Sequence, residues 1–249
     1  YAGTGAPYRS ALFRSNDGGQ TWEKTSLEMP EFCEGVNRPR MLAVAVDPQD
    51  PNDVWAGVEE GGLYRSRDGG DSWDRIDTTW SEFGGNSDLH GIMILPQEDG
   101  SKVHLALTVI ALYRSTDDGK TWVRTPAKEA WGLRYSRVLL RKPGSATQIA
   151  VGIGDGTPGT TAAILTSDDA GLTWTQATLD KPSNSCMWAF GSNPADPDFL
   201  LAASKFGYLY RSTDGGRNWV KEWREFNEIT DLAWVEGVPE DLGLPHVTN

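Results

Sequence analysis

Three side chains of this 249-residue chain are candidates for proton transfer. His90 is one of only three histidines, Asp88 lies two residues before it, and Asp231 lies in a strand-like segment near the end of the chain. Histidine and carboxylate side chains are common general acids and bases in enzymes. These residues could therefore catalyse a hydrolysis. The alternative for His90 is a hydrogen-bonded residue inside a strand.

Arginines and aromatic residues form a second candidate group, which would bind a ligand. An arginine guanidinium can donate two parallel hydrogen bonds to a carboxylate or phosphate, and a tryptophan ring can stack on a sugar. The candidates are Arg38, Arg40, Glu59, Tyr135, Arg137 and Trp188. They predict a small anionic or carbohydrate ligand. The alternative is that the arginines only neutralise carboxylates such as Asp88, Glu59 and Glu60.

An internal repeat predicts the elements that would position these side chains. Five segments share the pattern S-x-D-x-G-x-[TSN]-W, and their aspartates are Asp17, Asp68, Asp117, Asp169 and Asp214. These aspartates are 51, 49, 52 and 45 residues apart. A period of roughly 50 residues is typical of one four-stranded blade of a β-propeller.

Each repeat also contains strand-like segments. The innermost strand is predicted at residues 41–46, 90–95, 137–141, 188–192 and 231–235. Aligned on the prolines that follow four of these strands, one layer contains Leu42, His90, Arg137, Trp188 and Asp231. The layer two residues earlier contains Arg40, Asp88, Tyr135 and Cys186. The candidates should therefore converge at one mouth of the central channel, where a ligand pocket is expected.

The five segments resemble the Asp-box, or bacterial neuraminidase repeat, of sialidases, xyloglucan-cleaving glycosidases, sortilin-type receptors and a photosystem assembly factor. The resemblance covers nearly the whole chain. It implies a propeller in which each box forms the turn between the third and fourth strands, on the face opposite the usual active site. The box aspartates are therefore expected to hold turns rather than to catalyse a reaction. Because this superfamily contains enzymes, receptors and assembly factors, the resemblance leaves the function open.

The expected fold is all-β, with one domain over residues 1–249 that forms a five-bladed propeller of four-stranded blades. Residues 1–4 resemble a second strand with no first strand before it, and residues 229–235 resemble an inner strand with no blade after it. If these two segments share one blade, the ring closes and the exposed sheet edges disappear. Residues lost before Tyr1 would add part of a sixth blade.

Composition and charge narrow the choice of partners. The formal net charge of −12 disfavours nucleic acid and anionic membranes, and no apolar run is long enough to span a membrane. Cys33 and Cys186 are too few for a disulfide framework or a structural zinc site, and they are expected to be free thiols. The composition is that of a soluble protein, no signal peptide is visible, and the compartment stays open. No cofactor is expected, with calcium at the channel mouth as the alternative.

Three functional classes fit these observations. The first is a glycosidase-like hydrolase that acts on a small anionic or carbohydrate ligand at the channel mouth. The second is a glycan- or ligand-binding module without catalysis, and the third is a scaffold or assembly factor with a protein partner. A true sialidase is not expected, because residues 38–41 do not match the Phe/Tyr-Arg-Ile-Pro segment of sialidases.

Overall fold

The computed structural model describes residues 1–5, 10–33, 38–76, 88–235 and 237, which form five antiparallel sheets. The sheets are β1–β3 (Ala2–Gly3, Leu12–Arg14, Glu23–Lys24), β4–β7 (Arg40–Asp47, Asp50–Glu59, Gly62–Ser66, Asp74–Arg75), β8–β11 (Leu89–Pro96, Lys102–Thr108, Ala111–Ser115, Val123–Pro126), β12–β15 (Tyr135–Arg141, Ile149–Gly154, Ala162–Ser167, Thr175–Gln176) and β17–β20 (Met187–Asn193, Asp196–Ser204, Tyr208–Ser212, Asn218–Glu225). The short strand β16 (Thr178–Leu179) pairs in parallel with β20, and the short helix α1 (Ala127–Trp131) connects β11 to β12.

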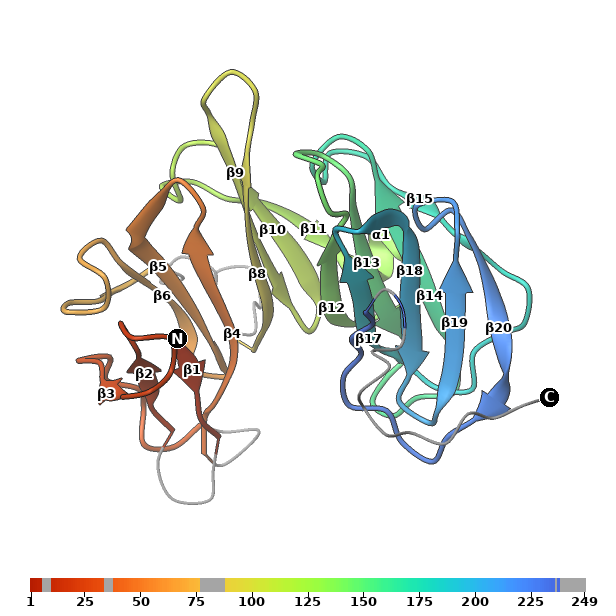
Figure 1. Cartoon of the computed structure of the whole chain (residues 1–249), viewed down its shortest axis with the longest axis horizontal. Coiled ribbons are helices and arrows are strands. Elements are labelled where there is room, and N and C mark those ends of the chain that lie inside the picture. Colours follow the sequence, from red (N-terminus) through yellow and green to blue (C-terminus); the bar gives the residue numbers. More distant parts are fainter. Residues whose placement is uncertain (6–9, 34–37, 77–87, 236, 238–249) are drawn as a thin grey trace.

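The sheets follow one another along an arc, and each sequence repeat supplies one of them (Figure 1). Within each repeat the strands pair in chain order, and the innermost strands β4, β8, β12 and β17 pack beside one another. The strands predicted at 41–46, 90–95, 137–141 and 188–192 are therefore confirmed. The all-β architecture and its four-stranded units are those expected of a propeller.

Packing between adjacent sheets builds the core. Strands β5, β6 and β13 are buried over most of their length because they lie inside this stack. Trp55, Leu63 and Leu89 are fully buried between the second and third sheets. Gly57 permits the close approach of these two sheets, since a Cβ atom at this position would lie 3.0 Å from Cβ of Leu89.

Ser66 and Asp68 illustrate how the Asp-box turns are held. Ser66 Oγ accepts a hydrogen bond from the Gly70 amide (2.7 Å) and donates one to Asp68 Oδ1 (2.7 Å). The Asp68 carboxylate accepts hydrogen bonds from the amide (2.8 Å) and hydroxyl (2.6 Å) of Ser72, and the Trp73 indole donates to the Gly70 carbonyl (3.1 Å). Equivalent turns form around Asp17, Asp117, Asp169 and Asp214. The turns join β2 to β3, β6 to β7, β10 to β11, β14 to β15 and β19 to β20.

An arginine next to the box serine links each of the first three sheets to the following one. The bonds run from Arg14 Nη1 to Gly69 O (2.5 Å), from Arg65 Nη1 to Asp118 O (2.8 Å) and from Arg114 Nε to Ala170 O (2.9 Å). Each accepting residue has a positive φ within the next Asp-box turn. We call these three bonds the arginine cross-links. At the fourth junction the equivalent residue is Thr166, and Lys142 instead forms an ion pair with Asp198 (2.6 Å).

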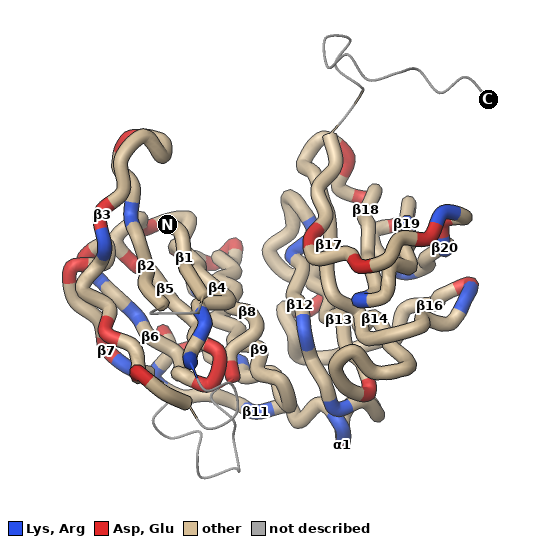
Figure 2. Tube along the Cα trace, turned by 90° about the horizontal axis from the view of Figure 1, so that it is seen from below, with Lys and Arg blue, Asp and Glu red and all other residues tan. Residues whose placement is uncertain are grey.

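Residues 229–235 do not form the expected inner strand. Exposure nevertheless alternates along residues 231–235, and the half-buried Leu232 and Trp234 lie against the fifth sheet. Leu232 lies over Gly191 of β17, and the Trp234 carbonyl accepts a hydrogen bond from Asn193 Nδ2 (2.9 Å). The first and fifth sheets are at opposite ends of the arc (Figure 2), so this segment has no strand to pair with. Closure into a five-bladed ring stays a prediction.

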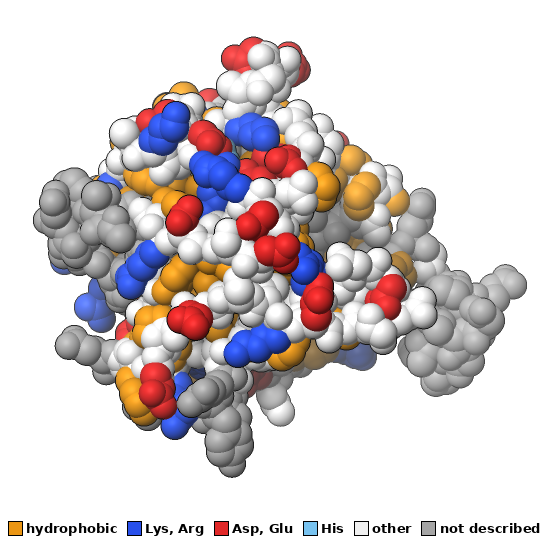
Figure 3. Space-filling view, turned by 90° about the vertical axis from the view of Figure 1, so that its left-hand side faces the viewer, with side chains coloured by type: hydrophobic (Ala, Val, Ile, Leu, Met, Phe, Trp, Pro, Cys, Tyr) orange, Lys and Arg blue, Asp and Glu red, His pale blue; other side chains and the backbone are white. Residues whose placement is uncertain are grey.

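The surface carries both positively and negatively charged side chains. On the face in Figure 3, acidic and basic side chains are interspersed with small apolar patches. In the part of the chain that the structure describes, no helix has the length and apolar character needed to cross a membrane.

Candidate functional site

A β-bulge occurs near the start of all four innermost strands. The register shifts between Met41 and Ala43, between Leu89 and Gly91, between Ser136 and Val138, and between Met187 and Ala189. The extra residues are therefore Leu42, His90, Arg137 and Trp188. A bulge bends its strand and redirects a side chain, and bulges are frequent beside active sites. The residues that the alignment predicted to share one layer thus occupy equivalent bulges on neighbouring strands.

His90 contacts two neighbouring groups through its two ring nitrogens. Nδ1 lies 2.7 Å from the carbonyl oxygen of Ser136, and because a carbonyl only accepts hydrogen bonds, Nδ1 carries a proton. Nε2 lies 3.3 Å from Asp88 Oδ1. A hydrogen bond between these two atoms requires a second proton, on either the ring or the carboxyl group. The Asp88–His90 pair is buried, and the His90 side chain is only 1% exposed.

Glu59 joins this pair from the second sheet. Oxygen or nitrogen atoms of Glu59, Asp88 and His90 all lie within 4.8 Å of one another. Arg40 binds both carboxylate oxygens of Glu59, with Nη2 2.6 Å from Oε1. Glu59 is thus held as an ion pair beside the Asp88–His90 pair.

Arg137 and Lys205 both contact the indole of Trp188. The guanidinium carbon and the ammonium nitrogen each lie 4.0 Å from the ring centroid, a distance at which cations are attracted to the π face. Lys205 also forms an ion pair with Glu228. Lys205 lies in the short loop between β18 and β19, which the sequence places at the same channel mouth, and its amide donates a hydrogen bond to the Cys186 carbonyl (3.0 Å) just before β17.

Tyr135 and Cys186 lie beside these groups. The Tyr135 ring is 5.5 Å from the His90 ring, and burial raises the pKa of its hydroxyl, so the hydroxyl keeps its proton at neutral pH. Burial also raises the pKa of the Cys186 thiol to about 11, which makes a thiolate nucleophile unfavourable. Both Cys33 and Cys186 are free, as expected.

The residues from Arg40 to Trp188 form a continuous row, which we call the rim. It runs from the second to the fifth sheet and contains Arg40, Glu59, Asp88, His90, Tyr135, Arg137, Trp188 and Lys205. Two predicted residues have other surroundings. Arg38 lies over the Phe32 ring (5.3 Å) and lines a pocket of about 300 Å³. Asp231 is exposed and accepts a hydrogen bond from the Leu232 amide (2.8 Å).

Trp131 of α1 packs against Trp174, with the two rings 5.3 Å apart, and it belongs to the edge of the core.

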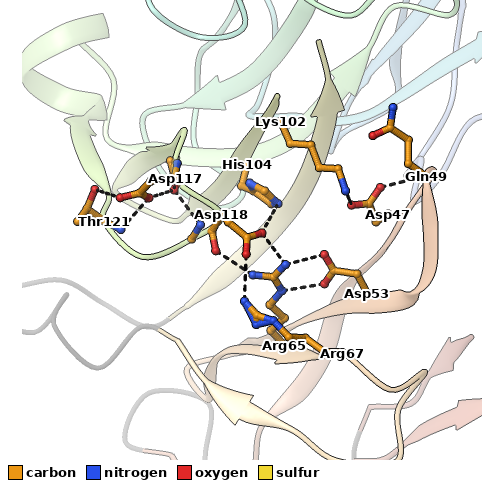
Figure 4. A network of polar contacts seen from close by, with 12 residues as sticks. Asp47, Gln49, Asp53, Arg65, Arg67, Lys102, His104, Asp117, Asp118 and Thr121 are labelled. Atoms are coloured by element: carbon orange, nitrogen blue, oxygen red, sulfur yellow. Dashed lines mark hydrogen bonds and ion pairs between the residues drawn. The ribbon is translucent and has the colours of Figure 1, made fainter. Parts of the chain in front are cut away.

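A second group of acidic and histidine residues lies where the second and third sheets meet (Figure 4). Asp53 and Asp118 point toward His104, but Arg65 occupies the space between them. Its guanidinium binds both Asp53 oxygens (2.7 and 2.6 Å) and Asp118 Oδ1 (2.6 Å). A metal ion would have to displace this buried cation, so the group is a structural cross-link rather than a metal centre.

The rim also lacks the donor set that calcium prefers. Calcium takes six to eight oxygen ligands. The described cluster offers two carboxylates and one imidazole, and both oxygens of Glu59 already bind Arg40. This donor set therefore does not match the preference of calcium.

Fold and repeat together define the chain as an Asp-box β-propeller protein. A family model described as Photosynthesis system II assembly factor YCF48 matches residues 5–152. The chain therefore belongs to this family of Asp-box repeat proteins.

Characterised relatives include both enzymes and assembly factors. A xyloglucanase of Paenibacillus is 30% identical over 86% of this chain and 23% of its own length, and one of Hypocrea jecorina is 28% identical over 90% and 30%. The photosystem II assembly lipoprotein Ycf48 of Synechococcus is 27% identical over 57% of the chain and 38% of its own length. The chain thus spans only about a quarter to a third of the two xyloglucanases.

Solved structures support the fold. The GH74 enzyme of Niastella koreensis superposes with a TM-score of 0.64 at 20% identity, covering 86% of this chain and 34% of that one. The GH74 xyloglucanase of Xanthomonas campestris gives a TM-score of 0.60 at 22% identity with the same coverage.

Proposed function

We propose that the rim is the site of a glycosidase-like hydrolase that acts on a carbohydrate. The observation that carries this proposal is the buried Asp88–His90 pair, in which the Ser136 carbonyl fixes the orientation of the imidazole. The names of the xyloglucanase relatives support a carbohydrate substrate.

In this proposal the pair donates or accepts one proton at the reacting oxygen. His90 is oriented by its Nδ1–H hydrogen bond, and Asp88 compensates the charge on the ring when Nε2 is protonated. Glu59 lies beside the pair, with its charge compensated by Arg40, and helps to hold the pair in place. The Trp188 indole, at the bulge of β17, gives the rim an aromatic surface for a sugar.

The test compares two Asp→Asn variants in an assay of reducing ends released from oligosaccharides, xyloglucan fragments included. Asp88→Asn should lower the rate by about 10²-fold or more, the usual contribution of a general acid or base. Asp99→Asn, in the exposed turn after β8, is the control and should keep the wild-type rate. Full activity of Asp88→Asn, or no hydrolysis of any saccharide by the wild type, would overturn the proposal.

A protein-binding scaffold is the second candidate. The matched family model describes an assembly factor, and β20 carries Trp223, whose side chain is 82% exposed. If this function holds, Trp223→Ser should release a co-purifying protein partner, whereas Asp88→Asn should not. Retention of the partner by Trp223→Ser would contradict the scaffold function and favour the hydrolase.

A further inference from the structure

The charges of the rim are paired, with one exception. Arg40 pairs with Glu59, and Lys205 pairs with Glu228. Among the described residues, Arg137 forms neither an ion pair nor a hydrogen bond, and its contact is the cation–π contact with Trp188. Water reaches this half-buried guanidinium, so its hydrogen-bond donors are free to bind a ligand.

The position of Arg137 suits it for recognition. It is the extra residue of the β12 bulge, and β12 lies between the strands that carry His90 and Trp188. Lys205 adds a second positive charge on the same indole. The protein as a whole has a net charge of −12 and repels anions. Affinity for an anion must therefore come from a local site, and the rim provides one.

We propose that Arg137 and Lys205 bind an oxyanion carried by an acidic saccharide, whose sugar ring contacts Trp188. This inference rests on the proposed function, and it specifies the substrate class as acidic rather than neutral. The guanidinium fork matches the two oxygens of a carboxylate or sulfate group, whereas the ammonium group of Lys205 contributes as a point charge. A neutral saccharide would leave Arg137 without a counter-charge.

The experiment is calorimetric titration of the purified chain with three matched oligosaccharides. One contains galacturonic acid, one is its carboxyl-reduced neutral counterpart, and one is the sulfated form of the neutral compound. We expect one or both acidic compounds to bind at least about tenfold more tightly than the neutral one. This preference should shrink as the salt concentration rises, because salt screens the charge. The carboxylate and sulfate arms identify which oxyanion the site prefers.

Two arginine variants separate recognition from general charge. Arg137→Gln should remove the preference for acidic compounds, whereas Arg134→Gln should keep it. Arg134 is the control because it is exposed, lies three residues earlier, and donates to the Asp155 carbonyl (3.0 Å). Arg137→Lys retains the charge but not the fork, and it replaces the glutamine variant if that protein does not fold. Loss of most of the preference in Arg137→Lys supports bidentate binding.

The outcomes distinguish this inference from the proposed function. Equal binding of acidic and neutral compounds overturns the inference and leaves a carbohydrate hydrolase in place. An acidic preference that survives in Arg137→Gln also overturns it. Absence of binding for all three compounds overturns the inference, and only the further absence of hydrolysis of every saccharide in the reducing-end assay overturns the proposed function as well.

Discussion

The box serine and aspartate are the same in all five turns, but water reaches the turns to different extents. Ser66 in the second box is 1% exposed and its partner Gly70 is buried, whereas Ser15 in the first box is only half-buried and its partner Gly19 is exposed. Each serine hydroxyl accepts a hydrogen bond from a glycine amide, Gly70 or Gly19. Loss of the hydroxyl therefore leaves a buried amide unpaired in one turn and a hydrated amide in the other.

This difference predicts unequal effects of the same substitution. Ser66→Ala should lower the free energy of unfolding by about 1–3 kcal/mol, the cost of an unsatisfied buried donor. Ser15→Ala should lower it by less, because water replaces the hydroxyl. Chemical denaturation of the two variants measures this difference, and equal losses would contradict it.

The carboxylates of the box turns predict acid sensitivity. Hydrogen bonds, first that of the Thr21 hydroxyl to Asp17 and that of the Ser72 hydroxyl to Asp68, lower the pKa of each carboxyl from 3.8 to about 2. A pKa lowered by folding gives stability that is present above the unfolded value and lost as the pH falls toward the folded value. Stability should therefore decline between about pH 4 and pH 2. Denaturation curves recorded across this interval should show a shallower decline for Asp68→Asn than for the wild type.

At the scale of residues, counting positions along the sequence was enough to predict which inner-strand residues share one layer. Counting back from the proline after each inner strand put His90, Arg137 and Trp188 in one layer, and these residues occupy equivalent bulges. The bulges themselves could not be predicted, because an extra residue in one strand is defined by its partner strand. Lys205 could be placed at the same mouth from the loop that contains it, but its contact with the Trp188 ring could not be predicted.

At the scale of elements, the arginine cross-links connect turns rather than strands. Arg65 is buried, and its guanidinium bridges Asp53 in its own sheet and Asp118 in the next one (Figure 4). The repeated arginine is visible in the sequence. Its acceptor was not predictable, because that carbonyl belongs to a residue about 50 positions away whose positive φ turns the oxygen toward the previous sheet.

Removal of one cross-link should be costly. Arg65→Met should lower the free energy of unfolding by about 3–5 kcal/mol, because it leaves the buried Asp53 carboxylate without its partner. Arg67→Met is the matched control. Arg67 is exposed and pairs with the same Asp118 (3.1 Å), so its loss should cost less than about 1 kcal/mol. Similar losses in both variants would show that burial of the ion pair is not what matters.

At the scale of the whole molecule, the position of residues 229–235 bears on whether the five sheets form an open arc or a closed ring. Leu232 lies over Gly191 of β17 as Leu139 of β12 lies over Gly91 of β8, so the segment occupies the position of the next innermost strand. The sequence pattern predicted an inner strand here, whereas the segment is not a strand in the structure. The pattern could not establish strand pairing, which depends on a partner at the far end of the arc.

Two substitutions in this segment distinguish the arrangements. Leu232→Asp should lower Tm in either case, because Leu232 faces the fifth sheet. Ala233 is exposed in the arc, so Ala233→Asp should leave Tm unchanged there. In a closed ring this segment would complete the first sheet, so Ala233 would face the second sheet and Ala233→Asp would lower Tm as well. Thermal unfolding of both variants therefore reports whether the ring closes.

The arginine cross-links also bear on how such proteins change over evolutionary time. At three successive junctions the donor is the same side chain and the acceptor is the same backbone group. Unequal recombination can delete or duplicate one of the repeats that meet at these three junctions. The new junction would again place an arginine beside a suitable carbonyl, so the cross-link would form without further mutation. The fourth junction uses Lys142 and Asp198 instead. Changes in repeat number should therefore be tolerated before this junction and selected against across it.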